Sequence, residues 1–565
     1  MSERDRFVEE RLPAAADLPD FIPLDYPPQL NAAVELLNGG APDALAIVNA
    51  HGRWTYADLD AFSGRIARLL VDQEGLVPGN RVLLRGPNGT TLFAAWLGVL
   101  KAGGVAVTTM PLLRPGELAT VIDKAEISLV IVDSRFIGDF REAMSQTRFV
   151  KHLVRYDGDH GQGELETRSR DLDPLPPVVT SPDDPALIAF TSGTTGTPKG
   201  CVHLHRDVLS PCDTFARNHF PMKPGDIVLA SAPIAFTFGL GATLLFPLRF
   251  GAATATVEKA TPTDLLEAIA RFGVTHLATA PTAYKAMLAE STDLTNSVRP
   301  ELVEGLPFSS PSGKKDNPST SSGRTEDGAL GRALKSLTAC VSAGEHLPQS
   351  VWQQWKDRTG LAIVDGIGAT EMMHIFISAS GAAIRPGSTG EAVPGFVATI
   401  LDPDGKELAQ GQGRLAVKGP TGCRYLADPR QADYVQGGWN VTGDTFRKDG
   451  DGYYWYVARS DDMIVSSGYN IAAPEVENAL LAHPAVAECA AIGVPCDERG
   501  QRVKAFIVLA DFATPSDELA DKLKAFVKAR IAPYKYPREI EFVGNLPKTV
   551  TGKLKRSELR SDSKC

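Results

Sequence analysis

Short apolar runs alternate with segments of helical periodicity through much of the first 280 residues, and this alternation most constrains the fold. Each apolar run has the composition of a buried strand, and each helical segment repeats apolar residues every three or four positions. The paired segments are 81–87 with 90–103, 105–109 with 116–126, 129–133 with 136–144, and 265–273 with 274–280. Strands joined through helices run parallel, so we expect an α/β fold with parallel or mixed sheets and helices on both faces.

The chain of 565 residues is longer than one core can serve, because single cores stop growing at about 250–300 residues. Past residue 400 the pattern changes to short strands and Asp-Gly turns, which predict a β-rich subdomain. A small α+β unit follows, with helices at 473–484 and 517–531 and strands at 486–495 and 503–510. We therefore expect a large domain over 1–460 and a small domain over 461–565.

Residues 296–329 interrupt this organisation. The segment is rich in Ser, Gly, Pro and charged residues and has little to bury, so it predicts a flexible surface insertion.

Composition excludes several classes of protein. The net charge of −10 argues against a nucleic-acid-binding protein, which would carry a basic patch. Seven scattered cysteines without CxxC spacing favour reduced thiols over disulfides or a zinc site. The charged N-terminus does not resemble a signal peptide, and the weakly polar run 232–248 is too short to cross a bilayer comfortably. We therefore expect a cytoplasmic protein without membrane contact. A serine hydrolase is excluded because no Gly-x-Ser-x-Gly occurs.

The stretch FTSGTTGTPKG, at 190–200, follows directly on the apolar run ALIAF. Its three glycines allow backbone amides to curl inward, and its hydroxyl side chains add donors, so the loop suits the β- and γ-phosphates of a nucleotide. It is not the Gly-x-x-x-x-Gly-Lys loop of P-loop proteins. A glycine-rich linker is the alternative, but linkers rarely abut a buried strand.

Six further segments follow this loop in a recognisable order. They are 232–241 (APIAFTFGLG), 342–347 (SAGEHL), 365–371 (DGIGATE), 442–444 (TGD), 459–477 (RSDDMIVSSGYNIAAPEVE) and 547–556 (PKTVTGKLKR). Together with the loop they resemble the adenylate-forming superfamily of acyl- and aryl-CoA ligases, luciferases and peptide-synthetase adenylation domains. The resemblance covers nearly the whole chain outside 296–329. It implies that acid and ATP give acyl-AMP and pyrophosphate, and that the thiol of CoA then displaces AMP.

The resemblance also implies a nucleotide site. Its ATP/AMP-binding residues would be Thr191, Ser192, Gly193, Thr194, Thr195, Gly196, Lys199, Gly344, Glu345, Asp365, Gly366, Ile367, Asp444 and Arg459. Asp444 would accept from both ribose hydroxyls, although Asp after Gly is by itself typical of a turn. Glu371 would bind Mg²⁺, and Thr370 would donate to the α-phosphate.

A mobile small domain is the third implication. Lys553 would swing in to bridge the acid and the α-phosphate, and its positive charge would stabilise the charge that develops there. Asp461 matches the hinge. After rotation Gly468, Tyr469 and Asn470 would contact CoA. The surroundings of Lys553 also resemble sites of lysine acetylation, so a lysine acetyltransferase is a possible partner that would switch off adenylation.

The segment DGIGATEMMHIFIS, at 365–378, resembles the corresponding sequence of benzoate-CoA and 2-aminobenzoate-CoA ligases. Segments 25–37, 77–88 and 106–118 show the same resemblance. We expect a flat, largely apolar slot for an aromatic acid, because glycines flanked by aromatic residues exclude a fatty-acid tunnel. Its predicted residues are Phe236, Phe238, Gly239, Ala343, Gly344, Gly366, Ile367, Gly368 and His374. His374 would contact the carboxylate or an ortho substituent, or serve only as a packing residue.

The favoured acid is 2-aminobenzoate, closely followed by benzoate, and the resemblance implies a role in aromatic compound degradation. Two alternatives remain open: another acyl-CoA ligase, and an adenylation module that loads a separate carrier protein. A non-catalytic descendant is disfavoured because Lys553, Glu371, Asp444 and Arg459 are all present. The sequence leaves monomer and homodimer open.

Overall fold

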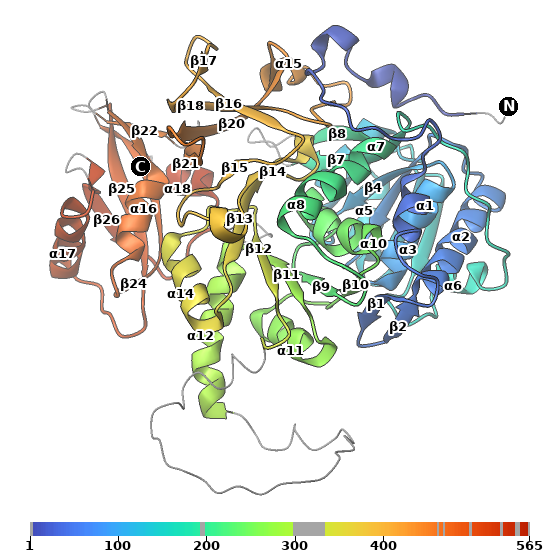
Figure 1. Ribbon diagram of the computed structural model, residues 1–565, viewed down its shortest axis with the longest axis horizontal. Coiled ribbons are helices and arrows are strands. Elements are labelled where there is room, and N and C mark those ends of the chain that lie inside the picture. The colour runs from blue at the N-terminus through green and yellow to red at the C-terminus, as the bar shows by residue number, and fades with distance from the viewer. Residues whose placement is uncertain are drawn as a thin grey trace, which may run out of the picture.

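The computed structural model describes residues 4–191, 198–297, 334–459, 463–466, 469–496, 500–531, 535–548 and 554–562. Two large sheets with their helices form one side of the molecule, a third sheet lies above them, and the C-terminal sheet lies on the opposite side (Figure 1). The mixed α/β architecture expected from the sequence is confirmed.

The first sheet has the strand order β6-β5-β3-β4-β7-β8. Its strands are β3 (Arg81–Arg85), β4 (Val105–Thr109), β5 (Leu129–Asp133), β6 (His152–Tyr156), β7 (Pro185–Thr191) and β8 (Lys199–Leu204). All pairs are parallel except the β7–β8 pair.

Helices cover both faces of this sheet, as the alternation predicts. Helices α2 (Tyr56–Asp72) and α3 (Thr90–Lys101) pack with Val82 and Leu84 of β3, whereas α4 (Pro115–Ala125) and α5 (Ile137–Met144) pack with Leu83. Successive strand residues point to opposite faces, so one strand serves two layers. Every residue of α3 is buried, which explains its nearly uninterrupted apolar composition.

The second sheet has the order β15-β14-β13-β12-β11-β9-β10-β1-β2. Its strands are β1 (Leu45–Asn49), β2 (Gly52–Thr55), β9 (Ile227–Ala230), β10 (Ala253–Ala255), β11 (His276–Thr279), β12 (Ala339–Ser342), β13 (Ile363–Gly368), β14 (Ile375–Ser378) and β15 (Glu391–Ala392). The strands from β1 to β13 pair in parallel, and β2, β14 and β15 are antiparallel.

The remaining helices of this part connect and cover the two sheets. They are α1 (Ala32–Leu37), α6 (Glu164–Ser169), α7 (His205–Pro211), α8 (Arg217–His219), α9 (Thr237–Leu240), α10 (Phe246–Arg249), α11 (Pro262–Phe272), α12 (Pro281–Ser297) and α14 (Gln349–Thr359). The run 232–248 forms α9, a buried π-helical turn at Gly241–Leu245 and the start of α10 in the core. None of the helices in the described ranges has the length and apolarity that a membrane crossing needs.

The third sheet is the β-rich subdomain. It contains β16 (Val397–Leu401), β17 (Glu407–Leu408), β18 (Gly411–Lys418), β19 (Val435–Gln436), β20 (Trp439–Lys448) and β21 (Tyr454–Arg459), with α15 (Gln431–Tyr434) beside it. The TGD stretch lies inside β20 and is not a turn. Gly443 has a φ of 77°, so glycine at this position permits a local irregularity that leaves the strand paired on both sides.

The C-terminal sheet has the order β23-β22-β25-β24, with β26 beside β25. Its elements are β22 (Met463–Ser466), β23 (Tyr469–Ala472), α16 (Ala473–Leu481), β24 (Val486–Cys496), β25 (Gly500–Leu509), α17 (Asp517–Lys528), β26 (Glu539–Phe542) and α18 (Arg556–Asp562). Both α16 and α17 end about three residues before the expected ends, and α16 stops short of Pro484, which disfavours helix in the residue before it. The sheet has its own apolar cluster. The domain boundary near residue 460 stays a prediction.

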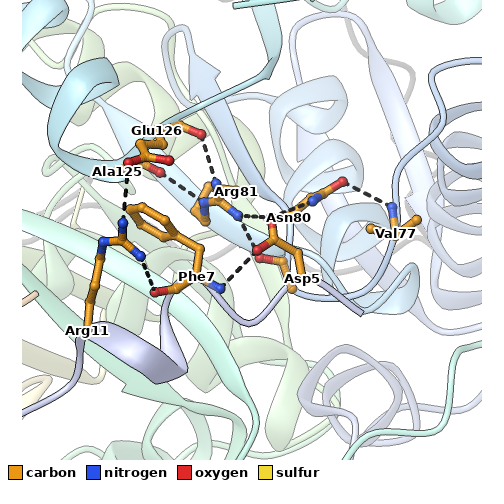
Figure 2. Close-up of polar contacts among 9 residues, drawn as sticks. Asp5, Phe7, Arg11, Val77, Asn80, Arg81, Ala125 and Glu126 are labelled. Atoms are coloured by element: carbon orange, nitrogen blue, oxygen red, sulfur yellow. Dashed lines mark hydrogen bonds and ion pairs between the residues drawn. The ribbon is translucent and has the colours of Figure 1, made fainter. Parts of the chain in front are cut away.

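The N-terminal segment runs as a strap along the first sheet (Figure 2). The ring of Phe7 lies between two guanidinium groups, 3.9 Å from Arg11 and 4.3 Å from Arg81. Arg81 pairs with Asp5 and donates from Nη2 to the Glu126 carbonyl oxygen over 2.9 Å. The strap then reaches the third sheet, because the amide of Ala427 donates to the Arg11 carbonyl oxygen (3.0 Å) and that of Ile22 to the Gly419 carbonyl oxygen (2.8 Å). It therefore supports the segment 419–428.

Candidate active site

The phosphate loop predicted from the sequence joins two antiparallel strands of the first sheet. Thr191, the last residue of β7, pairs with Lys199, the first residue of β8. Residues 192–197 lie outside the described residues, so the predicted positions Ser192, Gly193, Thr194, Thr195 and Gly196 are not placed. The Lys199 Nζ atom donates to the hydroxyl of Tyr425 over 2.8 Å and lies 4.6 Å from the centre of that ring.

The Thr-Glu segment leaves the end of β13. Thr370, Glu371 and Met372 form one 3₁₀ turn, and Met373 has a positive φ of 65°, which reverses the chain into β14. The buried imidazole of His203 on β8 donates from Nε2 to the Thr370 carbonyl oxygen over 2.8 Å. Burial lowers the pKa of His203 to about 4, so it is a neutral donor at pH 7. This bond ties the Thr-Glu turn to the strand that carries Lys199.

Tyr425 joins Lys199 to Glu371, and sequence reasoning missed it. Its hydroxyl accepts from Lys199 and donates to Oε1 of Glu371 in a short hydrogen bond. Tyr425 is 1% exposed and Glu371 is 6% exposed, so the contact is shielded from water. Nothing in the stretch RYLADP marks this residue, because its partners lie far away along the chain.

Two buried polar atoms on neighbouring strands lack partners within the described part of the chain. They are Oγ of Ser342 on β12 and Oδ1 of Asp365 on β13, and the two residues are paired in register. Burial raises the pKa of the Asp365 carboxyl to about 8. Buried polar groups normally have hydrogen-bond partners, so this pair fits a polar ligand group such as the amine and ring nitrogens of adenine.

Asp444 and Arg459 lie together on neighbouring strands. They pair across β20 and β21, and Nε of Arg459 lies 3.9 Å from Oδ1 of Asp444. The Asp444 side chain is 14% exposed and that of Arg459 is 49% exposed, so both can be reached by a ligand. Because β20 and β21 pair antiparallel, these two residues lie side by side although they are fifteen positions apart in the sequence.

His374 lies in an aromatic cluster with Phe215, Phe238 and Phe246. The ring centres are 5.3, 5.4 and 4.7 Å from that of His374, and Nε2 lies 3.4 Å from the Phe238 carbonyl oxygen. Burial lowers the pKa of His374 to about 3. A neutral imidazole cannot form an ion pair with a carboxylate, so the cluster is apolar apart from the ring nitrogens of His374.

Several glycines predicted to line the flat slot are needed for close packing. A Cβ atom on Gly239 would stand 2.1 Å from the Pro233 carbonyl oxygen, and one on Gly368 would stand 2.7 Å from the His374 carbonyl oxygen. A Cβ atom on Gly366 would meet the Ile375 side chain at 2.6 Å. These glycines therefore allow backbone segments to approach one another. Gly344 differs, because open space surrounds it and its φ is 90°.

The remaining predicted residues divide into placed and unplaced ones. Phe236, Ile367 and Glu345 are partly buried, and Ala343 is buried at the end of β12. Lys553, Asp461 and Gly468 lie outside the described residues, and Tyr469 and Asn470 open β23.

The small unit contacts the large one at the SAGEHL segment. His346 stacks on Tyr456 of the large unit with ring centres 5.5 Å apart, and its Nε2 lies 3.2 Å from Nδ2 of Asn478 on α16 of the small unit. Nζ of Lys285 on α12 makes a short contact with the Ala487 carbonyl oxygen. The C-terminal unit thus reaches the segment predicted to line the nucleotide site.

Comparison with known proteins agrees with this geometry. Residues 37–425 match the family model described as AMP-binding enzyme, and residues 475–553 match the AMP-binding enzyme C-terminal domain. The chain belongs to the AMP-binding enzyme family, in its aryl-CoA ligase branch, and is an acid–thiol ligase. The resemblance inferred from the ordered motifs is confirmed.

Individual relatives span nearly the whole chain. The benzoate–CoA ligase of Thauera aromatica is 34% identical over 550 residues, which are 95% of this chain and 97% of that protein. The crystal structure of the anthranilate CoA ligase AuaEII in complex with anthranoyl-AMP has a TM-score of 0.84 at 32% identity, covering 96% of this chain and 98% of that one. A benzoate CoA ligase from Burkholderia xenovorans LB400 has a TM-score of 0.79 at 30% identity, covering 94% and 99%. The use of ATP and CoA follows from membership of this family.

Proposed function

We propose that this protein activates a planar aromatic carboxylic acid, 2-aminobenzoate or benzoate, as the aryl-AMP with release of pyrophosphate. It then transfers the aryl group to CoA with release of AMP. The observation that carries the proposal is the aromatic wall of Phe215, Phe238, Phe246 and His374, of which His374 lies three residues after Glu371. In this proposal the ring of the acid would pack against Phe238, the one member of the cluster that is only partly buried, with its carboxylate toward Thr370.

The nucleotide would lie across the ends of the second and third sheets. Ser342 and Asp365 provide unsatisfied polar atoms for adenine, and Asp444 and Arg459 provide a carboxylate and a guanidinium for the ribose. Lys199 marks the side on which the triphosphate would lie. Catalysis of adenylation is then mainly a matter of holding two anions together, which positioning and charge neutralisation achieve.

Glu371 is the proposed magnesium ligand. In the part of the chain that the structure describes, no group of three or more His, Cys, Asp or Glu residues could form a protein-only metal site. A single carboxylate fits Mg²⁺ that arrives with ATP, because this ion commonly binds one or two carboxylates together with substrate phosphates and waters. When bound, the ion would neutralise phosphate charge during attack by the acid.

We assign the bridging charge in adenylation to Lys553 and the hinge to Asp461, within a small domain over 461–565. Leu554 bridges to Lys548 just after Lys553, and Arg556 pairs with Glu477 over 2.8 Å, so the neighbouring chain is anchored to the small unit. After rotation, Gly468, Tyr469 and Asn470 would contact CoA.

The preference for an aromatic acid is supported by the neutral state of His374. Its uncharged imidazole accepts an amine or hydroxyl substituent as readily as it packs on a plain ring, so 2-aminobenzoate and benzoate both suit the wall. The anthranilate and benzoate ligases among the relatives support the same pair of acids.

Acid-dependent ATP–pyrophosphate exchange tests the proposal. The panel should contain benzoate, 2-aminobenzoate, hydroxybenzoates, phenylacetate and octanoate. We expect benzoate or 2-aminobenzoate to give the highest kcat/KM, and a preference for octanoate would refute the aromatic wall as the acid site. A second assay with free CoA and carrier-bound pantetheine should show transfer to CoA; exclusive transfer to a carrier protein would refute that step.

A further inference from the structure

We propose that Tyr425 is a positioning residue that holds Lys199 and Glu371 in a fixed relation for binding Mg²⁺ with ATP. This inference rests on the proposed function, because it takes Glu371 as the magnesium ligand and Lys199 as a residue of the triphosphate site. The juxtaposition itself is a feature of the structure. The hydroxyl of Tyr425 stands between the ammonium of one group and the carboxylate of the other.

The Tyr425 hydroxyl has one proton to donate, and it donates this proton to Oε1 of Glu371. Its oxygen accepts from Nζ of Lys199 over 2.8 Å. A lysine ammonium can only donate and a carboxylate can only accept, so the hydroxyl between them accepts from Lys199 and donates to Glu371. The direction of both hydrogen bonds is therefore fixed.

This arrangement suits a metal and phosphate site better than a direct ion pair. A lysine ammonium has three protons and a carboxylate has two oxygens. A direct Lys199–Glu371 pair would turn both charges toward each other. With Tyr425 between them, one proton of Lys199 and one oxygen of Glu371 are used for orientation. The other protons of Lys199 can then donate to phosphate, and the other oxygen of Glu371 can bind the metal.

The backbone around Tyr425 is held by the strand that carries Lys199. The amide of Val202 donates to the Arg424 carbonyl oxygen, and the amide of Leu426 donates to that of Gly200, both over 2.8 Å. The amide of Tyr425 donates to Oε1 of Gln431 over 3.0 Å. The segment 424–426 thus pairs with β8 through an antiparallel bridge between Tyr425 and Cys201, so the hydroxyl has little freedom to move away from its two partners.

Tyr434 offers a matched control. Its ring packs edge-on against Tyr425 with centres 5.9 Å apart, and Lys199 lies 6.0 Å from its centre. The Tyr434 hydroxyl is buried without a hydrogen-bond partner among the described residues. Tyr434→Phe therefore removes a hydroxyl from the same cluster without removing a bond, whereas Tyr425→Phe removes two.

The test measures metal and nucleotide binding without turnover. Isothermal titration with α,β-methylene-ATP at varied Mg²⁺ gives the apparent metal affinity of each full-length variant. Loss of a group that orients a metal ligand typically lowers metal affinity about 10–100-fold, and we expect a loss in this range for Tyr425→Phe and none for Tyr434→Phe. Pyrophosphate exchange should show the same split, with a raised KM for MgATP and an unchanged KM for the aromatic acid.

The outcomes separate this inference from the proposed function. If the unmodified protein binds the analogue with Mg²⁺ and Tyr425→Phe binds it equally well, the positioning role is refuted. If the unmodified protein shows no Mg²⁺-dependent nucleotide binding, the proposed function fails first. A double-mutant cycle with Glu371→Gln guards against misfolding, because the effect of Tyr425→Phe on metal affinity should largely vanish when the charged partner is gone. Additive losses would also refute the positioning role.

Discussion

The buried ion pair beside Tyr425 allows a quantitative prediction about stability. Nη1 of Arg424 lies 2.7 Å from Oδ2 of Asp207, and the two side chains are 7% and 0% exposed. The same Asp207 oxygen accepts from the Leu204 amide over 2.8 Å, and the Arg424 guanidinium covers the ring of Phe21 at 4.4 Å. Arg424→Met would leave the Asp207 carboxylate buried without its cation. Removal of one partner from a buried pair costs about 3–5 kcal/mol, so we expect the free energy of unfolding to fall by that amount.

Urea denaturation followed by tryptophan fluorescence measures this loss. The control is Arg424→Met combined with Asp207→Asn, which removes the stranded charge and keeps an acceptor for the Leu204 amide. We expect the double variant to recover more than half of the lost free energy. The reasoning is wrong if Arg424→Met unfolds at the urea concentration of the unmodified protein, or if the double variant is no more stable than the single one.

Three further perturbations test the site. Gly239→Ala places Cβ 2.1 Å from the Pro233 carbonyl oxygen, so overpacking should cost about 1–3 kcal/mol in urea denaturation and raise the KM of the aromatic acid while that of ATP is unchanged. Burial lowers the pKa of His374 from its ordinary value of 6.5 to about 3 in the folded protein, so its contribution to stability is complete above pH 6.5 and is lost as the pH falls toward 3. His374→Phe should make the free energy of unfolding less dependent on pH in that window, and an unchanged slope would contradict this. Lys553→Ala should slow pyrophosphate exchange about 10²–10³-fold and leave thioester formation from supplied aryl-AMP near the original rate; equal loss of both would contradict the assignment.

The sequence predicted best those features that local patterning determines. The strands and helices of the first sheet follow directly from apolar periodicity, since β3 to β5 are buried throughout and α4 and α5 carry apolar stripes. The pairing of Asp444 with Arg459 could be foreseen only through family resemblance. Viewed locally, Gly443 and Asp444 indicate a turn, and the pairing of β20 on both sides overrides that preference.

The sequence predicted least well how the chain folds back on itself. It predicts a flat slot lined by glycines, and it does not reveal that the backbone of Pro233 approaches Gly239 or that the backbone of His374 approaches Gly368. Tyr425 was missed because its partners lie much farther along the chain. It lies 226 positions from Lys199 and 54 positions from Glu371, so no local pattern could connect the three residues.

The location of Tyr425 also explains why stability and chemistry should be coupled in this protein. Lys199 begins a strand of the first sheet, Glu371 follows a strand of the second, and Tyr425 lies in the segment between β18 and α15 that the N-terminal strap supports. The charged groups are therefore oriented only when these three parts are packed together. A substitution that loosens the packing, such as Arg424→Met, should lower the affinity for MgATP before it unfolds the chain. Weakened nucleotide binding in fully folded Arg424→Met protein would be the signature of this coupling.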